Sequence, residues 1–476
     1  ILHTVAGAYM TLSEGHLIAF FGVMVLISWV GVNAARKVKN ANDFAVGGRK
    51  SGVPMVSGTI VGTIIGGAST VGTAQLAFSI GLSAWWFTLG AGIALIVMAA
   101  FYAVPLRASK LQTIPQFLAL HYGPRAAMLA AIAASVGIFF SIVANILAAT
   151  PLVAALFQTD STRAVAFVMA LTVVYVLFGG VWATGRVGIW KTILIYITLI
   201  SVGYVTYTRM GGWNGFYSAF PAYPWFSLIG RGGWTDLGSA LSLLVGTLTT
   251  QTYIQALFSA KDEKTAKAGA ITAALITLPS GIPAVMVGLF MRVHHPDILP
   301  IDALPLFVLS YLPPWLGGVA IAALLLAAIG SAAGLALGVG TMLNRDILPA
   351  AHWKFCETHA LFSNRIAVFL VMMGAALFTF GNLRSLVLEW NFLSMGLRGA
   401  GIFLPFTLAI FMPGRFKPQF AVLSIAIGTI VTIGWKFLFP QGADPLYAGL
   451  IVSGIVFCCG FTKRQAMEPA TRNLQG

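Results

Sequence analysis

The stretch that decides the fold is Gly66-Gly67-Ala68-Ser69-Thr70-Val71-Gly72-Thr73, which lies in the middle of an otherwise apolar segment. Glycines and small hydroxyl residues in such a segment favour a break in a membrane-spanning helix. Lipid offers no partners for free backbone groups, so a break is tolerated only where it faces protein or a water-filled cavity. A broken helix inside a bundle of spans is therefore the best sequence pointer to the binding site of a transporter.

The composition is that of a membrane protein along nearly the whole chain. Of 476 residues, 58% are hydrophobic and 9% are charged, whereas a soluble domain carries about 25% charged residues. We expect an all-α polytopic protein with about thirteen transmembrane helices of roughly 17–25 residues, the length that crosses the hydrocarbon core. The expected spans are 15–34, 54–80, 83–105, 126–156, 164–180, 187–208, 235–258, 269–291, 314–343, 365–381, 386–411, 419–438 and 445–461.

The net charge of +15 is placed in a way that indicates membrane orientation rather than nucleic-acid binding. With the N-terminus outside, most lysines and arginines fall in cytoplasmic loops, including Arg36, Lys37 and Lys39 early and Lys261 and Lys264 later. Cytoplasmic loops of membrane proteins carry this excess of positive charge. We therefore predict an N-out, C-in protein of the cytoplasmic (inner) membrane, with no nucleic-acid partner.

Two sets of five spans follow the first span, and each set opens with a helix that glycine interrupts. The second interruption is Ser242-Leu-Leu-Val-Gly246-Thr-Leu-Thr-Thr250. Five spans per half insert the second half upside down, which is the inverted repeat with paired broken helices of secondary transporters. The alternative is that these glycines only allow close helix packing. We divide the chain into 1–53 (leading helix and first loop), 54–208 (first repeat), 209–412 (outer loop and second repeat) and 413–476 (two further helices and a tail).

Two segments are too short to span the membrane. Residues 301–314 predict an outer helix, either a gate over the pathway or an inert cap, and 113–123 predict a short amphipathic cytoplasmic helix.

The chain resembles the sodium:solute symporter family over roughly residues 15–460. The resemblance implies the leucine-transporter fold and a secondary active symporter that imports a small polar organic solute by alternating access. Five segments in the family's order carry it: Asp43–Arg49 in the first cytoplasmic loop, Gly66–Gly72 on the first core helix, Tyr175–Gly180 with Ala183 at the turn between the fourth and fifth, Gln251–Gln255 with Ser259–Glu263 on the sixth, and Ala327–Ser331 through Arg345-Asp346 on the eighth.

The resemblance also implies a Na⁺ site between the broken first core helix and the eighth. Its ligands would be the carbonyl oxygens of Ala68, Val71 and Ala327 and the hydroxyl of Ser331, because hard cations prefer oxygen. The second hydroxyl position of the family is Gly330 here, so one ligand is missing.

A second departure is Val187-Gly188-Ile-Trp-Lys191, where the family usually reads Thr-Asp-x-x-Gln. A charge at membrane depth costs about 2.5–3.5 kcal/mol on insertion scales, so it marks a partner or a function. We interpret Lys191 as a substitute for Na⁺, since sodium-independent members of the wider fold place a lysine or arginine on the fifth core helix. Lys191 could then carry a coupling proton. Alternatively, Lys191 snorkels to cytoplasmic water, and the remaining oxygens hold Na⁺ as in ordinary sodium symport.

The solute site is expected between the two broken helices and the third core helix. Sugar-transporting relatives carry polar residues where this chain has Leu243 and Gly246, which argues against a sugar. Freed amides at the first break could bind a carboxylate, so we prefer an amino acid or a monocarboxylate. Each polar side chain could instead bond a neighbouring helix. The expected contacts are Ser69, Thr70, Thr73, Gln75, Ser141, Asn145, Gly246 and Gln251.

Two further charges lie on the expected tenth core helix. Glu389, near its outer end, is the second candidate proton carrier after Lys191. Arg398 lies within the span and could meet a substrate carboxylate. A similar Leu-Arg-Gly/Ala stretch in choline-type relatives favours a structural or inner-gate role instead.

Other functional classes fit the sequence less well. No nucleophile–base or metal-ligand cluster is visible, so we expect no enzyme and no cofactor beyond the coupling ion, Na⁺ or H⁺. A channel is disfavoured because no filter motif is present. A transporter-like sensor of a signalling system remains an alternative, although the residues after 461 are too few for a kinase. The expected partners are the solute, the cation and the lipid bilayer, with the protein working as a monomer.

Overall fold

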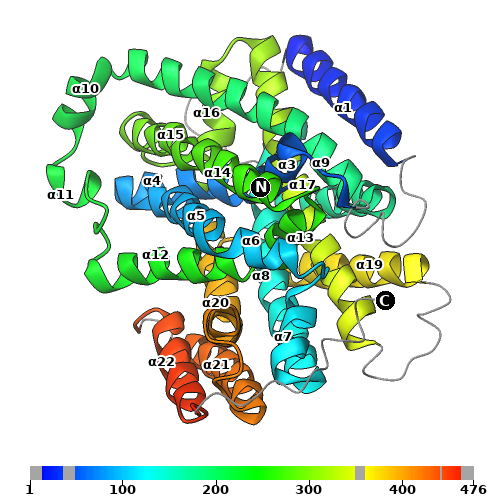
Figure 1. Ribbon diagram of the computed structural model, residues 1–476. Helices are drawn as coiled ribbons and strands as arrows, with labels where there is room; N and C mark the ends of the chain where they lie inside the picture. Colours follow the sequence, from blue (N-terminus) through cyan, green and yellow to red (C-terminus); the bar gives the residue numbers. More distant parts are fainter. Residues whose placement is uncertain (1–12, 36–48, 349–359, 440–441, 463–476) are drawn as a thin grey trace.

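A computed structural model describes residues 13–35, 49–348, 360–439 and 442–462. Within these ranges the regular structure is helical, as expected (Figure 1). Nine described stretches are long and apolar enough to cross a membrane, and each expected span lies on a helix. Residues 43–48 of the first-loop motif and 463–476 of the expected tail lie outside the described residues. The division into repeats at 54–208 and 209–412 stays a prediction.

The helices fall into long continuous elements and shorter ones that adjoin breaks or turns. The long helices are α1 (Glu14–Ala35), α8 (Pro124–Phe157), α9 (Ser161–Arg209), α17 (Pro314–Met342), α19 (Ala360–Phe380), α20 (Val387–Phe411) and α21 (Pro418–Leu438). The shorter ones are α3 (Val53–Ile64), α4 (Thr73–Ile80), α5 (Trp86–Val97), α6 (Ala103–Ala108), α7 (Ile114–Tyr122), α10 (Gly212–Ala219), α11 (Ala222–Trp225), α12 (Gly233–Leu248), α13 (Gln251–Ser259), α14 (Glu263–Thr277), α15 (Gly281–His294), α16 (Ala303–Tyr311) and α22 (Pro445–Cys458).

Both expected helix breaks are present. After α3 the chain unwinds at 65–67, resumes as a π-helical turn, η2 (Ala68–Gly72), and continues as α4. The second break separates α12 from α13 at Thr249 and Thr250, whose backbones leave the helical conformation. The two short helices are also confirmed, as α16 on one side and α7 on the other.

The burial of the helices shows which of them form the centre of the bundle. In the most apolar stretch of α17, 94% of the residues are buried. The corresponding share is 17% in α1 and 28% in α21. In Figure 1, α1 lies at one edge and the adjacent pair α21 and α22 at the opposite edge. The broken helices and α8 therefore pack around α17, and the first and last spans cover the outside.

One expected turn is absent. We predicted that the fourth and fifth core helices are separated near Gly179-Gly180, but α9 runs unbroken for 49 residues. The segment contains no proline, and glycine costs a helix only about 1 kcal/mol per residue. At about 1.5 Å per residue α9 is about 73 Å long, more than twice the length of about 30 Å that one span needs.

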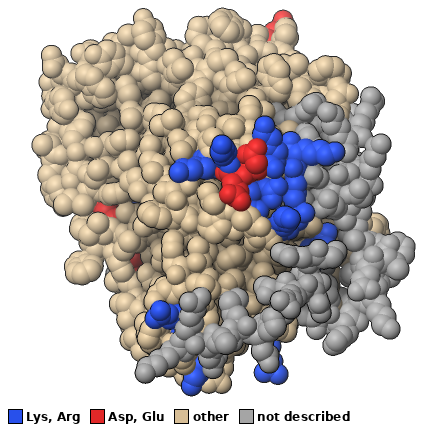
Figure 2. Space-filling view, viewed as in Figure 1, with Lys and Arg blue, Asp and Glu red and all other residues tan. Residues whose placement is uncertain are grey.

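Positive charge gathers on one face of the molecule. Figure 2 shows lysines and arginines clustered around a few acidic residues on the face that is viewed in Figure 1. Lys261, Lys264 and Lys267 are exposed where α13 leads into α14. Arg107 donates from Nε to the carbonyl of Ala260 at 2.6 Å. This face is the one that the charge distribution assigns to the cytoplasm.

Three glycines allow α9 to cross α3 at close range. A Cβ atom at Gly62 would lie 2.8 Å from Cα of Gly188, and one at Gly188 would collide with the carbonyl oxygen of Gly58. Small residues four apart on one helix let a second backbone approach in this way. The contact brings the fifth core helix directly onto the first.

Replacing Gly188 should therefore destabilise the bundle. We expect Gly188→Ala to lower the free energy of unfolding by about 1–3 kcal/mol, because overpacking forces the two backbones apart. Thermal denaturation in detergent, followed by tryptophan fluorescence, measures the effect. The control is Gly434→Ala on α21, where nothing lies within 4 Å of the added Cβ. Since alanine favours a helix over glycine, that variant should be unchanged or more stable. Equal effects of both would contradict the packing argument.

Candidate functional site

The first break frees backbone carbonyls, among them that of Gly62. In a continuous helix the N–H of Gly66 would donate to it. Instead the N–H of Gly66 donates to the carbonyl of Ile64 at 3.0 Å and to Oγ of Ser69 at 3.0 Å. A carbonyl without a partner inside a membrane protein costs free energy, so Gly62 presents an acceptor to whatever lies beside it.

The side chain of Lys191 fills this place. Its Nζ donates to the carbonyl of Gly62, to the carbonyl of Ala327 at 3.1 Å and to Oγ of Ser331 at 3.3 Å. Lys191 is 2% exposed. An ammonium group has three N–H bonds and no acceptor, so the three oxygens match it completely. Ser331 also donates to Gly62 at 3.3 Å, which joins α17 to the end of α3.

The structure thus brings together three of the five residues expected at the cation site. Lys191, Ala327 and Ser331 meet, whereas Ala68 uses its carbonyl to accept from the hydroxyl of Thr73 at 3.2 Å. Val71 is buried in the π-helical turn. Gly62 takes the place of their carbonyls. Sequence reasoning missed Gly62, although the spacing Gly58-x-x-x-Gly62 signals a close helix contact.

Three hydroxyls expected at the solute site satisfy the break itself. Ser69 donates to the carbonyl of Gly66 at 3.0 Å, and Thr70 donates to the same oxygen at 2.9 Å. All three hydroxyl residues, Ser69, Thr70 and Thr73, are completely buried. In this state these side chains stabilise the unwound segment rather than offer themselves to a ligand.

The two expected polar residues of α8, Asn145 and Ser141, form a chain of hydrogen bonds, here called the relay, between α20 and the first break. Asn145 accepts from the N–H of Gly67 at 3.0 Å and donates to the carbonyl of Ser141 at 2.8 Å. Ser141 donates to Oδ1 of Asn391 at 3.0 Å and lies 2.7 Å from Oγ of Ser394. Asn391 and Ser394, on α20, had not been singled out from the sequence.

Two glutamines hold the second halves of the broken helices at opposite ends of the bundle. Gln75 on α4 accepts from the N–H of Val387 at 2.9 Å and donates to the carbonyl of Ser385 at 3.4 Å. Gln251 on α13 accepts from the N–H of Ile114 at 2.9 Å and donates to the carbonyl of Gln112 at 3.0 Å. Each amide therefore joins a broken helix to the surface segment that covers it.

Further bonds fix the cytoplasmic end. Thr113 caps α7 by accepting from the N–H of Gln116 at 3.1 Å, and it donates to Oδ1 of Asp346 at 3.1 Å. Asp346 lies just after α17 and is 8% exposed. Three consecutive residues, 112–114, thus tie the cytoplasmic helix α7 to both α13 and the end of α17.

The remaining expected site residues occupy different surroundings. Gly246 allows close packing, since a Cβ there would lie 2.5 Å from Cβ of Met395. Glu389 is exposed in the first turn of α20. Arg398 is completely buried two turns below Asn391 on the same helix.

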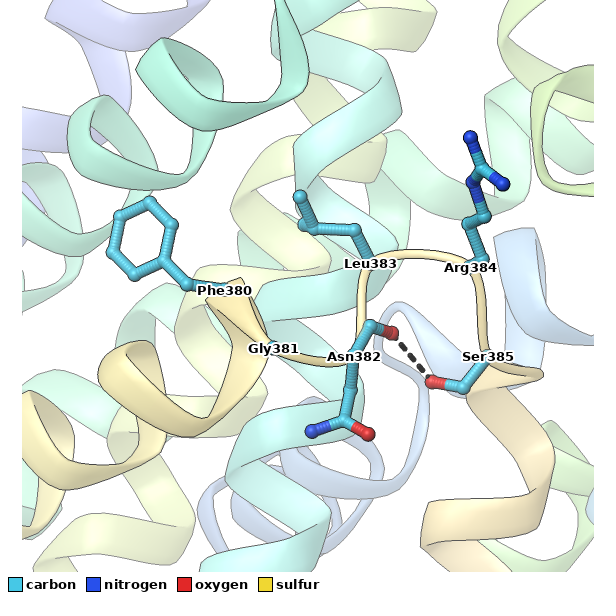
Figure 3. Close-up of a pocket in the computed structure, with 6 residues that line it drawn as sticks. All are labelled: Phe380, Gly381, Asn382, Leu383, Arg384 and Ser385. Atoms are coloured by element: carbon cyan, nitrogen blue, oxygen red, sulfur yellow. Dashed lines mark hydrogen bonds between the residues drawn. The ribbon is translucent and has the colours of Figure 1, made fainter.

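A hollow of about 460 Å³ opens at the loop that joins α19 to α20. Its walls are Phe380, Gly381, Asn382, Leu383, Arg384 and Ser385. Figure 3 shows the bond from Oγ of Ser385 to the carbonyl of Asn382, which shapes this loop. The same Ser385 offers its carbonyl to Gln75, so the hollow adjoins the end that Gln75 closes and is separate from Lys191.

Comparison with known proteins identifies the family of this chain. The model of the sodium:solute symporter family matches residues 44–428. The chain belongs to this family. The match covers both broken helices, Lys191 and its three acceptors, and therefore confirms the expected family.

The curated relatives are transporters of different small solutes. The human high affinity choline transporter 1 is 27% identical over 287 residues, which cover 57% of this chain and 49% of that protein. The osmoregulated proline transporter OpuE of Bacillus subtilis is 27% identical over 202 residues, 40% of each chain. The chain spans about half the length of the first curated relatives that it matches.

Solved structures confirm the fold. A Na⁺-coupled sialic acid symporter in a substrate-bound outward-open state aligns with a TM-score of 0.78 at 18% identity, covering 94% of this chain and 97% of the other. Mhp1, a nucleobase-cation-symport-1 family transporter in a closed conformation, aligns with a TM-score of 0.57 at 13% identity, covering 88% and 95%. The chain therefore has the leucine-transporter fold that the resemblance implied.

The relay on α8 predicts the effect of removing Asn145. We expect Asn145→Leu to lower the free energy of unfolding by about 1–3 kcal/mol, because the buried N–H of Gly67 loses its acceptor. Thr150→Val on the same helix is the control, since that hydroxyl bonds only within its own helix, to Ile146. Chemical or thermal unfolding in detergent compares the two. If both variants lose the same stability, the relay does not support the break.

Proposed function

We propose that this protein is a secondary active, cation-coupled symporter that imports a small polar organic solute by alternating access. Membership of the sodium:solute symporter family and the two broken helices support this function. The expected setting is the cytoplasmic membrane, with the monomer as the working unit.

The observation that carries the proposal is the set of acceptors around Lys191. The family name points to Na⁺ as the coupling ion, and a Na⁺ site would need the oxygens that here receive an ammonium group. Na⁺ and the ammonium group of Lys191 cannot both bind these three oxygens at the same time. We therefore propose that Lys191 replaces Na⁺ and that a proton on its Nζ couples transport.

Loss of the proton from Nζ of Lys191 would change the contact of α9 with α3 and α17. Neutral lysine has two N–H bonds for three acceptors, so one link among Gly62, Ala327 and Ser331 is lost. The bonds join α9 to α3 and α17. Protonation would thus hold the broken helix against α17, and deprotonation would release it, as binding and release of Na⁺ would in a sodium symporter.

The two glutamines provide gates for alternating access. Opening the end of the bundle at the start of α20 requires Gln75 to leave Ser385 and Val387. Opening the cytoplasmic end requires Gln251 to leave the start of α7. Since each gate rests on two hydrogen bonds at about 0.5–1.5 kcal/mol each, either end opens at modest cost. The solute proposed is an amino acid or a monocarboxylate, which the likeness to a proline transporter supports. The choline transporters among the relatives make a quaternary ammonium the competing class.

Replacing the ammonium should create a response to Na⁺. We expect wild-type protein to show no specific stabilisation by NaCl over KCl at constant ionic strength. Lys191→Gln, which leaves the acceptors free for a cation, should be stabilised by about 1.4 kcal/mol at ten times the dissociation constant of Na⁺. Tryptophan fluorescence during thermal unfolding reports the shift. Lys267→Gln, at an exposed lysine, is the control. Saturable stabilisation of the wild type by Na⁺ would instead indicate ordinary sodium symport.

Transport itself is tested in proteoliposomes. We expect labelled L-proline or pyruvate to accumulate when the lumen is more alkaline than the medium, and accumulation to collapse when a protonophore is added. A Na⁺ gradient at equal pH should drive none, and Lys191→Gln should lose the response to pH. Accumulation that requires Na⁺ would overturn proton coupling. Failure of proline, pyruvate and choline to accumulate under either gradient would favour the sensor alternative.

A further inference from the structure

Arg398 is a buried charge that forms no salt bridge with the described residues. Its side chain is 0% exposed on α20, and its stem lies against Gly137 of α8, where a Cβ would approach Cγ of Arg398 to 2.7 Å. The guanidinium thus lies between α8 and α20.

The partners of Arg398 leave part of the guanidinium unused. Nε donates to the carbonyl of Ser394 at 3.2 Å, Nη2 contacts Sδ of Met395 at 2.9 Å, and Nη1 has no partner. The ion pairs in the described part of the chain involve Arg163 and Arg231 instead. Intramembrane charges usually pair with another charge or mark a ligand pathway, so the missing partner is informative.

A second unused donor lies on the same face of α20. Nδ2 of Asn391 is buried and without a partner, although Oδ1 of the same amide accepts from Ser141. Residues 391, 394 and 398 are three, four and seven apart and therefore share one helix face. The bond from Arg398 back to Ser394 directs the guanidinium along the helix toward Asn391. Both unused groups are hydrogen-bond donors, so the site lacks an acceptor. Because the guanidinium is positively charged, a negatively charged acceptor is favoured.

This pair of donors is connected to the first helix break. Asn391 leads through Ser141 and Asn145 to the N–H of Gly67 in that break. A ligand on Arg398 and Asn391 would therefore contact the side chains that reach the unwound segment.

We propose that Arg398 and Asn391 bind the carboxylate of the transported solute. This inference rests on the proposed symporter function and names the chemical class of its solute. A carboxylate accepts two charge-assisted hydrogen bonds from a guanidinium fork and has lone pairs left for an amide. It would neutralise Arg398 and satisfy both Nη1 and Nδ2 at once.

Binding is measured by thermal stabilisation of purified protein in potassium methanesulfonate, without a gradient. The probes are acetate against acetamide and L-proline against L-prolinamide, which differ in the carboxylate alone. We expect acetate and L-proline to stabilise the wild type saturably and the amides not to. Stabilisation by chloride or by choline, without an effect of acetate or L-proline, would overturn the proposal. So would equal stabilisation by each acid and its amide.

Two variants assign the binding to these residues. Arg398→Gln should raise the half-saturating concentration of acetate by roughly 10- to 100-fold, as expected for a lost charge-assisted hydrogen bond. Asn391→Asp keeps the oxygen that accepts from Ser141 but replaces the donor with a carboxylate. It should leave ligand-free stability unchanged or raise it, while abolishing stabilisation by acetate. Arg125→Gln, at an exposed arginine of α8, should bind acetate as the wild type does. Acetate binding that survives in Asn391→Asp would sink the assignment.

Binding and transport fail in different ways. If acetate binds through Arg398 and yet no probe accumulates in proteoliposomes, the anion site is supported and the symporter function is overturned. If choline or L-prolinamide accumulates and Arg398→Gln transports it as the wild type does, the symporter function stands and the carboxylate site is overturned.

Discussion

The need to satisfy backbone groups at the first helix break organises the centre of this protein. Inside a membrane an unpaired carbonyl or amide has no water to turn to, and the unwinding at 65–67 frees several at once. The hydroxyls of Ser69 and Thr70 take the carbonyl of Gly66, the amide of Asn145 takes the N–H of Gly67, and Lys191 takes the carbonyl of Gly62. Two neighbouring helices, α8 and α9, are thereby held to one segment, so the break is also a point where the bundle is joined.

The two buried cations of the core differ in what surrounds them. Lys191 has an acceptor for each of its three N–H bonds, so its ammonium group is fully hydrogen-bonded without a ligand. Arg398 lacks an acceptor for Nη1 and lies beside a second unused donor on Asn391. Burying a charge is costly unless hydrogen bonds repay the lost hydration. A fully paired cation therefore holds two helices together, whereas an incompletely paired one is suited to a ligand that comes and goes.

The glutamine contacts at the two ends of the bundle are few, in contrast to the densely bonded centre. Gln75 and Gln251 each bridge a broken helix to backbone groups of a surface segment. An amide that bonds backbone atoms can exchange them for water when the end opens, so neither gate needs a charged pair to be torn apart. Rigidity around the break and exchangeable contacts at the ends together fit the alternating access proposed above.

The sequence by itself determined the membrane class, both helix breaks, the short helices α7 and α16, and the unusual lysine, because hydropathy, glycine and proline act locally along the chain. It did not determine that α9 is continuous, since Gly179-Gly180 permits a turn without requiring one. Nor did it show that Gly62 supplies the carbonyl to Lys191, or that Ser141 and Asn145 bond Asn391 and the N–H of Gly67. Those assignments depend on which helices face one another, and that is decided only when packing brings distant residues within hydrogen-bonding distance.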